Sequence, residues 1–128
     1  MVDSLSIQTY DGTRNFSVKA VDVSDGTGLT AQAIATASSF TPNLSGHSKI
    51  RRIRFSVSGM NVRLQWNGGT PGDIAYLSPG EDILDWSDTY AGGFPNNAVT
   101  PNGNIIVTTI GQVSGSGFTL EIEGIKGA

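Results

Sequence analysis

The sequence predicts an all-β protein, a jelly-roll-like β-sandwich of about eight strands. Three observations lead to this class. Short segments alternate between apolar and polar residues, which is the pattern of a half-buried strand. Turn signals rich in the 17 glycines and 5 prolines separate these segments at intervals of roughly 8–12 residues. A two-sheet jelly roll suits eight strands because it protects the sheet edges.

The first forty residues contain one clear strand. Residues 1–14 lack apolar periodicity and are predicted to form an extended N-terminal arm, which leaves residues 15–128 as a single β-sandwich domain. Residues 16–23 alternate, with Phe16 and Val18 on one face, and are predicted to be a strand. In residues 30–38 the alanines favour a helix and the threonines favour a strand, so both alternatives stay open.

The middle of the chain holds four further strands. Residues 52–57 and 61–66 alternate on either side of a Ser-Gly turn and are predicted to form a β-hairpin. Residues 73–77 and 81–86 are two shorter strands separated by a Pro-Gly turn.

The last third begins with the longest irregular stretch, residues 87–103, which is rich in Gly, Asn and Pro. Residues 104–110 follow as a β-branched run that is predicted to be buried on both faces. Residues 118–122 form the closing strand, and its inward side chains are predicted to be Phe118, Leu120 and Ile122.

Composition excludes most kinds of catalytic site. The chain has no cysteine and one histidine, His47, so thiol chemistry, disulfides and multi-histidine metal sites are excluded. No apolar run approaches the ~18 residues of a membrane span. The N-terminal residues lack the basic and apolar regions of a signal peptide, which predicts synthesis in the cytoplasm. We therefore expect no cofactor, no membrane partner and no small-molecule substrate.

Charge is separated along the chain, although the net charge is only −3. Residues 1–64 carry seven basic and four acidic side chains, a balance of +3, whereas residues 65–128 carry one basic and seven acidic side chains, a balance of −6. Two interpretations stay open: the basic side docks on an acidic partner, or the strands neutralise one another within one monomer. Nucleic acid is not an expected partner, because the chain is acidic overall and no aromatic residues alternate with its arginines.

Three groups of residues could carry chemistry. His47 lies in a loop, and no nucleophile elbow accompanies it, so a surface role is favoured over a catalytic triad. A carboxylate cluster could hold Ca²⁺, or could include a glycosidase pair in Glu81 and Asp85, but a solvated acidic face is favoured. This cluster consists of Asp73, Glu81, Asp82, Asp85 and Asp88. An aromatic group could stack on sugars, but a core or loop-anchoring role is favoured; its members are Trp66, Tyr76, Trp86, Tyr90 and Phe94.

In the order of its segments the chain resembles the small decoration, or cement, proteins of tailed-phage capsids. The resemblance covers residues 49–126 and includes the loop Gly92-Gly93-Phe94-Pro95-Asn96. It also includes the strand that runs from Pro101 through Asn104 to Gly111, and the closing segment 117–126. Phe94 stands where Leu is usual in these proteins, and Asn104 stands where Asp is commoner.

The resemblance implies a homotrimer on the outer surface of the capsid, in contact with the major capsid protein. We therefore expect a structural virion protein without enzymatic activity. The predicted capsid or subunit contacts lie in the arm, on a basic strand face and in the 90–97 loop, and they are Tyr10, Arg14, Arg51, Arg52, Arg54, Arg63, Tyr90, Phe94 and Asn96. The alternative function is a carbohydrate-binding β-sandwich module of a phage or bacterial surface protein, with Trp86, Tyr90 and Phe94 as its binding platform.

Overall fold

The computed structural model describes residues 4–40, 44, 48–86 and 93–126, which form ten β-strands and one 3-10 turn. None of its described helical segments is long and apolar enough to cross a membrane. The strands are β1 (Ser4–Asp11), β2 (Asn15–Asp25), β3 (Gln32–Ala35), β4 (Lys49–Ser58), β5 (Asn61–Thr70), β6 (Gly72–Leu77), β7 (Gly80–Asp85), β8 (Phe94–Pro95), β9 (Val99–Ile110) and β10 (Ser114–Ile125). The 3-10 turn is η1 (Ala37–Ser39).

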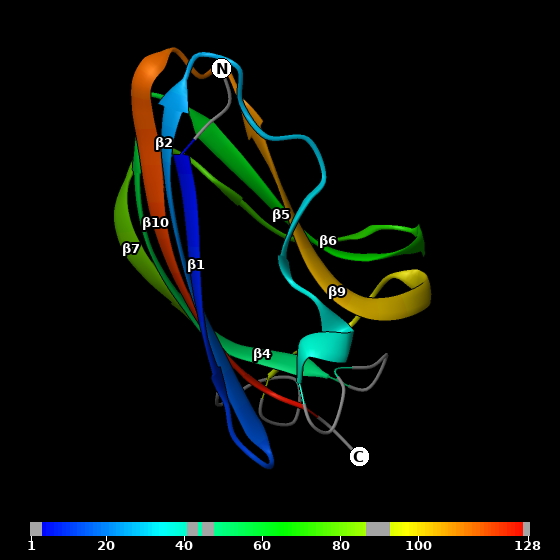
Figure 1. Ribbon diagram of the computed structural model, residues 1–128. Coiled ribbons are helices and arrows are strands. Elements are labelled where there is room, and N and C mark those ends of the chain that lie inside the picture. Colours follow the sequence, from blue (N-terminus) through cyan, green and yellow to red (C-terminus); the bar gives the residue numbers. More distant parts are fainter. Residues whose placement is uncertain (1–3, 41–43, 45–47, 87–92, 127–128) are drawn as a thin grey trace.

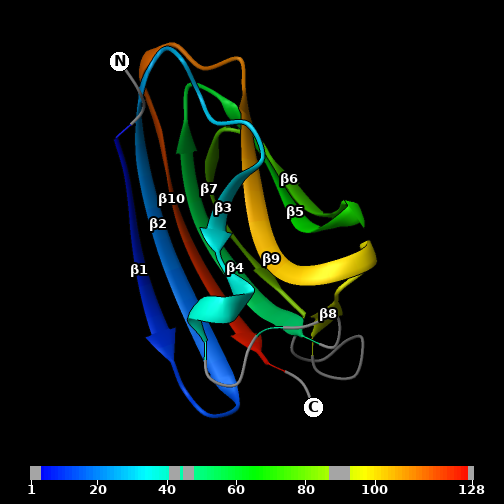
Figure 2. The ribbon, with the colours of Figure 1, turned by 45° about the vertical axis from the view of Figure 1, so that its right-hand side comes forward.

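The strands form two antiparallel sheets that face each other as a β-sandwich, as predicted (Figure 1). The six-stranded sheet has the order β1-β2-β10-β4-β7, with β8 paired to the end of β4. The four-stranded sheet has the order β3-β9-β5-β6. Figure 2 shows the four-stranded sheet in front of the six-stranded one.

The pairing of the strands is nested. Apart from β1 and β8, the described residues form eight strands. The first of these pairs with the eighth (β2 with β10) and the second with the seventh (β3 with β9). In the same way the third pairs with the sixth (β4 with β7) and the fourth with the fifth (β5 with β6). The pairs β10–β4 and β9–β5 then join these four ribbons into the two sheets.

One hydrophobic cluster fills the space between the sheets. Alternating side chains of β2 and β10 contribute from one side, and those of β5 and β9 contribute from the other. The predicted inward residues Phe16, Val18, Phe118, Leu120 and Ile122 are all buried, which confirms the strand predictions at both ends of the domain. The run Ile105-Ile106-Val107 is buried on both faces of β9, as its β-branched sequence predicts.

The predicted hairpin of residues 52–57 and 61–66 is wrong. Both segments are strands, but β4 pairs with β10 and β7 whereas β5 pairs with β9 and β6. The turn at Ser58-Gly59 carries the chain from one sheet to the other instead of joining two neighbours. Gly59 adopts φ 74°, and a Cβ there would lie 2.7 Å from Ser116 Oγ. Two alternating segments and a glycine turn indicate strands but do not specify their partners.

The segment predicted as an extended arm also differs in the structure. Residues 4–11 form β1, an edge strand that pairs antiparallel with β2 in an unbroken register from Ser4↔Val23 to Asp11↔Phe16. Its apolar residues are few because an edge strand packs on the core through one end only, at Leu5. In the ambiguous segment 30–38 both alternatives occur in part, since β3 is followed directly by η1.

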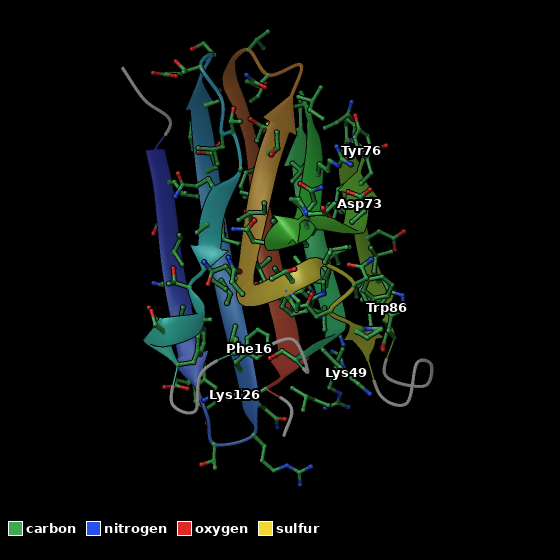
Figure 3. All side chains as sticks on the ribbon, turned by 90° about the vertical axis from the view of Figure 1, so that its right-hand side faces the viewer. Phe16, Lys49, Asp73, Tyr76, Trp86 and Lys126 are labelled. Atoms are coloured by element: carbon green, nitrogen blue, oxygen red, sulfur yellow. The ribbon has the colours of Figure 1, made fainter. Side chains whose placement is uncertain are left out.

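Near the C-terminus, Lys126 ties the last described residues to the β1–β2 turn (Figure 3). Its side chain is fully buried and forms an ion pair with Asp11. Its ammonium group lies 5.7 Å from the centre of the Phe40 ring. Its backbone N–H donates to the carbonyl of Arg14 at 2.7 Å, and its carbonyl accepts a hydrogen bond from Ser48 Oγ at 2.7 Å. This cluster holds the end of β10 against the first hairpin.

Candidate functional site

The outer face of the six-stranded sheet carries a ladder of alternating charges. Residues directly opposite each other on paired antiparallel strands point to the same face. Arg52 therefore lies between Asp85 on β7 and Glu123 on β10, at 3.7 and 3.8 Å. Arg54 lies opposite Glu121, and their charged atoms are 4.0 Å apart. Arg52 and Arg54 therefore each have an acidic partner in the same chain, which agrees with the second of the two interpretations of the charge pattern.

Arg63 does not belong to this face. It projects from β5 between the buried residues Val62 and Leu64, so it lies on the outer face of the four-stranded sheet. The four arginines predicted as one basic face are therefore divided between the two opposite surfaces of the sandwich. The alternation along each strand was predicted correctly, but the division follows from the crossing at Gly59, which was not.

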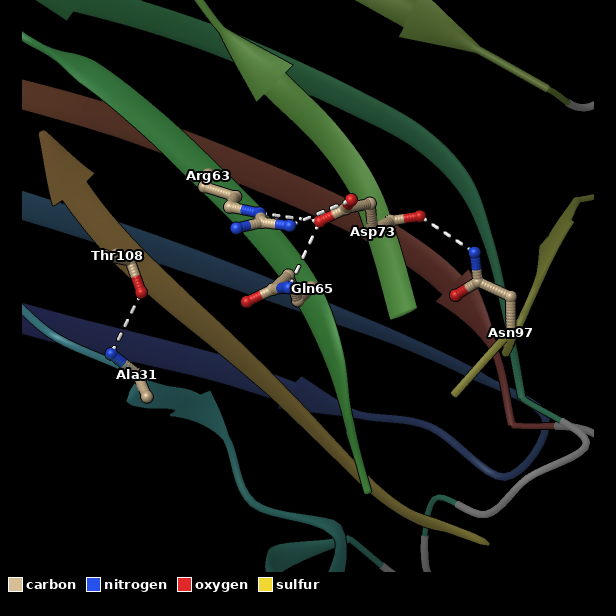
Figure 4. Close-up of polar contacts among 6 residues, drawn as sticks. All are labelled: Ala31, Arg63, Gln65, Asp73, Asn97 and Thr108. Atoms are coloured by element: carbon tan, nitrogen blue, oxygen red, sulfur yellow. Dashed lines mark hydrogen bonds and ion pairs between the residues drawn. The ribbon is translucent and has the colours of Figure 1, made fainter. Parts of the chain in front are cut away.

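Arg63 and Asp73 form a bidentate ion pair, with hydrogen bonds of 2.7 and 3.1 Å (Figure 4). Gln65 Nε2 donates to the same carboxylate at 3.1 Å, and Asn97 Nδ2 donates to the backbone carbonyl of Asp73 at 2.9 Å. The hydrogen bond from Arg63 is the main cause that lowers the pKa of Asp73 below its ordinary value; burial acts in the opposite direction, and the charge of Arg63 and the hydrogen bond from Gln65 lower the pKa further. The same contact raises the pKa of Arg63. Both groups therefore stay charged at neutral pH.

The structure describes five of the remaining predicted contact residues, which are Tyr10, Arg14, Arg51, Phe94 and Asn96. Tyr10, Arg14 and Arg51 are exposed, and Tyr10 and Arg51 line one shallow groove together with Glu123. Phe94, on β8, is half-buried and stacks at 5.3 Å against Trp86. Both rings pack against the core cluster, which supports an anchoring role over a sugar-stacking platform.

Some of the other predicted residues fall outside the described residues, and the rest do not come together as one site. His47, Asp88 and Tyr90 are outside the described residues. Asn96 Oδ1 accepts the N–H of Ala98 at 3.1 Å and so shapes its own turn. Glu81 and Asp85 are four residues apart on β7, roughly 13 Å at the usual rise of a strand. Glycosidase carboxyl groups lie about 5–10 Å apart, so the spacing of this pair does not match.

In the part of the chain that the structure describes, no three His, Cys, Asp or Glu side chains gather as metal ligands would. The acidic residues predicted as one cluster are divided in the same way as the arginines, because Asp73 lies on β6 in the four-stranded sheet and Glu81 on β7 in the other. The favoured interpretation of these carboxylates as a solvated face agrees with their exposure.

Comparison with known proteins adds no relative. No protein-family model, curated protein or solved structure matches this chain. Its function is therefore inferred from the sequence, the fold and the two outer surfaces of the sandwich.

Sequence reasoning missed the surface of the four-stranded sheet. Tyr76 and Ile110 are exposed on this sheet and border one shallow groove beside Arg63 and Asp73. The sequence contains a signal for this surface, because no charged residue occurs between Asp88 and Glu121. That interval supplies the whole of β9, which lies in the middle of the sheet.

Proposed function

We propose that this chain is a capsid decoration protein. It binds the outer surface of a phage head as a homotrimer and stabilises the lattice of the major capsid protein, without catalysis. It is made in the host cytoplasm and resides on the exterior of the virion. The sequence resemblance suggests this function, and the order of the strands is the structural observation that carries it.

The nested pairing of eight strands supports a jelly roll. In that fold two Greek keys give two four-stranded sheets, and here the corresponding sheets are β2-β10-β4-β7 and β3-β9-β5-β6. Jelly rolls are common in viral capsid domains and in lectins. Since fold alone does not give function, the resemblance of residues 49–126 is what favours the capsid over the glycan.

Two positions of the resembling motifs have a physical reason in the structure. Gly93 lies under β4, where an added Cβ would approach Lys49 Cβ to 3.0 Å and the carbonyl of Ile50 to 3.1 Å. Asn104 Oδ1 accepts the N–H of Ala37 at 2.7 Å, at the start of η1. An aspartate carboxylate would supply the same acceptor, which explains why either residue suits this position of the motif.

A decoration protein acts by mass action. A protein that binds only the assembled shell opposes its disassembly, in proportion to its affinity and concentration. A trimer that contacts several capsid subunits gains further, because each bound copy raises the effective concentration of the others. No deep cleft is needed for this work, and exposed sheet faces are sufficient.

The proposal is tested with capsids assembled from the major capsid protein encoded in the same genome. The purified chain is added to these capsids, and binding is followed by co-sedimentation and by cryo-electron microscopy. We expect saturable binding at defined positions of the lattice and a higher temperature of capsid disruption. Absence of binding at micromolar concentrations contradicts the proposal, and specific retention on a glycan array favours the carbohydrate-binding alternative.

A further inference from the structure

The outer face of the four-stranded sheet carries far fewer charged side chains than the outer face of the six-stranded sheet, and its two charges are opposite. We call it the neutral face; its central residues are Gln65, Arg63, Tyr76, Asp73, Thr108 and Ile110. Arg63 and Asp73 are the only charged residues in the four described strands of this sheet, and they neutralise each other. By contrast, the ladder on the opposite face includes Lys19, Arg52, Arg54, Glu81, Asp85, Glu121 and Glu123.

The neutral face has the composition of a buried protein interface. The centres of such interfaces are depleted of charged residues and enriched in tyrosine and arginine. Here Tyr76 is 55% exposed and Ile110 is 40% exposed, and both border the groove next to Arg63. The ion pair at its centre already has bidentate geometry and a third hydrogen bond from Gln65, so covering it leaves few polar atoms without a partner. Figure 3 shows Tyr76 and Asp73 on the same side of the molecule.

A flap extends this face beyond the sandwich. The end of β5 (residues 67–70) pairs with the start of β9 (residues 99–103), at Gly68↔Pro101 and Thr70↔Val99. The flap stands out from the body of the molecule on the side of the four-stranded sheet (Figure 1). It contains no charged residue, and Val99 at its rim is exposed.

The backbone of the flap is strained at one residue and closely packed at another. Thr100 adopts φ 51°, a left-handed conformation that is costly for a β-branched residue. Gly68 permits the close pairing, since a Cβ there would lie 2.7 Å from the carbonyl of Val99. The side chain of Asn97 bonds to the backbone of Asp73, which connects the base of the flap to the neutral face. The flap and the face therefore form one continuous surface.

We infer that a second copy of this chain covers the neutral face and the flap. In the proposed trimer, equivalent residues of neighbouring copies approach one another close to the three-fold axis, so an unpaired charge placed there would face the same charge on the next copy. The neutral face avoids this cost because its two charges are opposite and paired. The same two groups can also exchange partners between copies, with Arg63 of one facing Asp73 of the next. This inference rests on the self-association included in the proposed function.

Two matched pairs of substitutions test the inference. Tyr76→Arg and Ile110→Arg place a charge on the neutral face. Val23→Arg and Ile83→Arg place the same charge on the six-stranded sheet, at positions that are 54% and 47% exposed. Sedimentation velocity over a range of concentrations gives the oligomeric state, and circular dichroism verifies the fold of each variant.

We expect the unaltered chain to sediment as an oligomer and the two neutral-face variants to raise the dissociation constant of self-association at least tenfold. The two control variants should match the unaltered chain. A monomeric unaltered chain at 100 μM or so overturns the inference, as does dissociation by the control variants alone or equal dissociation by all four. Capsid binding is measured separately, so a monomer that still binds capsids contradicts this inference and leaves the decoration function standing.

Discussion

At the scale of single residues, the ion pair between Lys126 and Asp11 is asymmetric in burial. The lysine side chain is fully buried, whereas that of the aspartate is 35% exposed. Removing one partner of such a pair is costly mainly through the charge that stays behind in a dry environment. The position of the remaining charge should therefore decide the effect of each substitution.

We expect Asp11→Asn to destabilise the fold more than Lys126→Met. The first change leaves a buried ammonium without the Asp11 charge and should cost about 2–3 kcal/mol. The second leaves a partly hydrated carboxylate and puts an apolar chain of similar length against Phe40, so its cost should be about 1 kcal/mol or less. Urea denaturation of the two variants measures both values. A larger loss for Lys126→Met would contradict the argument.

Trp66 is a core residue with a polar atom that finds no acceptor among the described residues. It is fully buried on β5, and its indole Nε1–H has no hydrogen-bond partner there. We expect Trp66→Phe to cost about 1–2 kcal/mol, because the lost packing is partly offset by removal of this buried N–H. Leu64→Ala, two residues away and equally buried, should cost about 2–5 kcal/mol. Thermal and urea unfolding measure the loss of stability in both variants. A larger loss for Trp66→Phe than for Leu64→Ala would show that the indole N–H has a hydrogen-bond partner.

Asp73 makes stability depend on pH in a defined direction. Its pKa is lower in the folded state than in the unfolded chain, chiefly through the hydrogen bond from Arg63. The resulting stabilisation is complete above the unfolded pKa of about 3.9 and is lost as pH falls through the folded pKa. The unfolding midpoints of the unaltered chain and Asp73→Asn should therefore differ at pH 6 and converge as the pH falls through the lowered pKa of Asp73 in the folded state. The difference should be small, because the pair is exposed. A difference that grew with acidification would have the wrong sign.

At the scale of elements, the crossing between β4 and β5 depends on Gly59. Gly59 and Gly111 both adopt φ 74°, but only Gly59 is crowded, by Ser116. An added Cβ at Gly111 meets nothing within 4 Å. The two glycines therefore form a natural comparison in which backbone strain is equal and crowding differs.

We expect Gly111→Ala to cost about 1 kcal/mol from the left-handed backbone alone. Gly59→Ala should cost roughly 1–2 kcal/mol more, since Ser116 Oγ donates to the Gly59 carbonyl at 2.9 Å and cannot move away freely. Denaturant unfolding at neutral pH gives both numbers. Equal losses would mean that the turn relaxes around the new methyl group.

The strands themselves could be predicted from the sequence, because burial of one face makes apolar residues recur at every second position. This period located the inward residues of β2 and β10, such as Phe16 and Leu120, and the run at Ile105 was long enough to indicate burial on both faces. The partners of each strand could not be predicted, because alternation is the same whichever neighbour a strand has. For β1 even the strand was missed, since only Leu5 of that edge packs on the core.

The candidate surfaces were also predictable in part, because alternation along a strand shows which side chains point outward. Arg54 and Arg63 were correctly placed on outward faces by alternation. Their separation onto opposite sides, and the partners Glu121 and Asp73, depend on the register between strands that lie far apart in sequence or beyond a turn. Ile110 was not singled out because it is one exposed apolar residue in a strand, and Tyr76 was placed instead with the aromatic group of residues 66–94. Only the assembled sheet brings the two residues together beside Arg63 and Asp73.

At the scale of the whole molecule, the two outer faces are suited to different contacts. If the neutral face joins copies of the chain, the charge ladder on the other sheet is left to contact the shell. Its ion pairs lie at 3.7–4.0 Å between exposed groups, so each contributes little to folding and is available to a charged partner. This division predicts a salt-dependent attachment to the capsid.

We expect Arg54→Gln to weaken capsid binding about fivefold and to flatten its dependence on salt. Val113→Glu changes the net charge by the same amount at an exposed position in the loop between β9 and β10, outside the charge ladder, and should leave binding unchanged. Co-sedimentation with capsids at two ionic strengths measures both effects. Equal behaviour of the two variants would remove the charge ladder from the docking surface.

The central position of β10 has a consequence for synthesis in the cell. This strand lies between β2 and β4, yet it is separated from β2 by most of the chain. During translation β2 and β4 therefore emerge from the ribosome long before the strand that joins them, and contacts of this range form slowly. We expect the nascent chain to stay unfolded until residues 114–125 have left the exit tunnel, so that ribosome-stalled shorter chains are digested by protease.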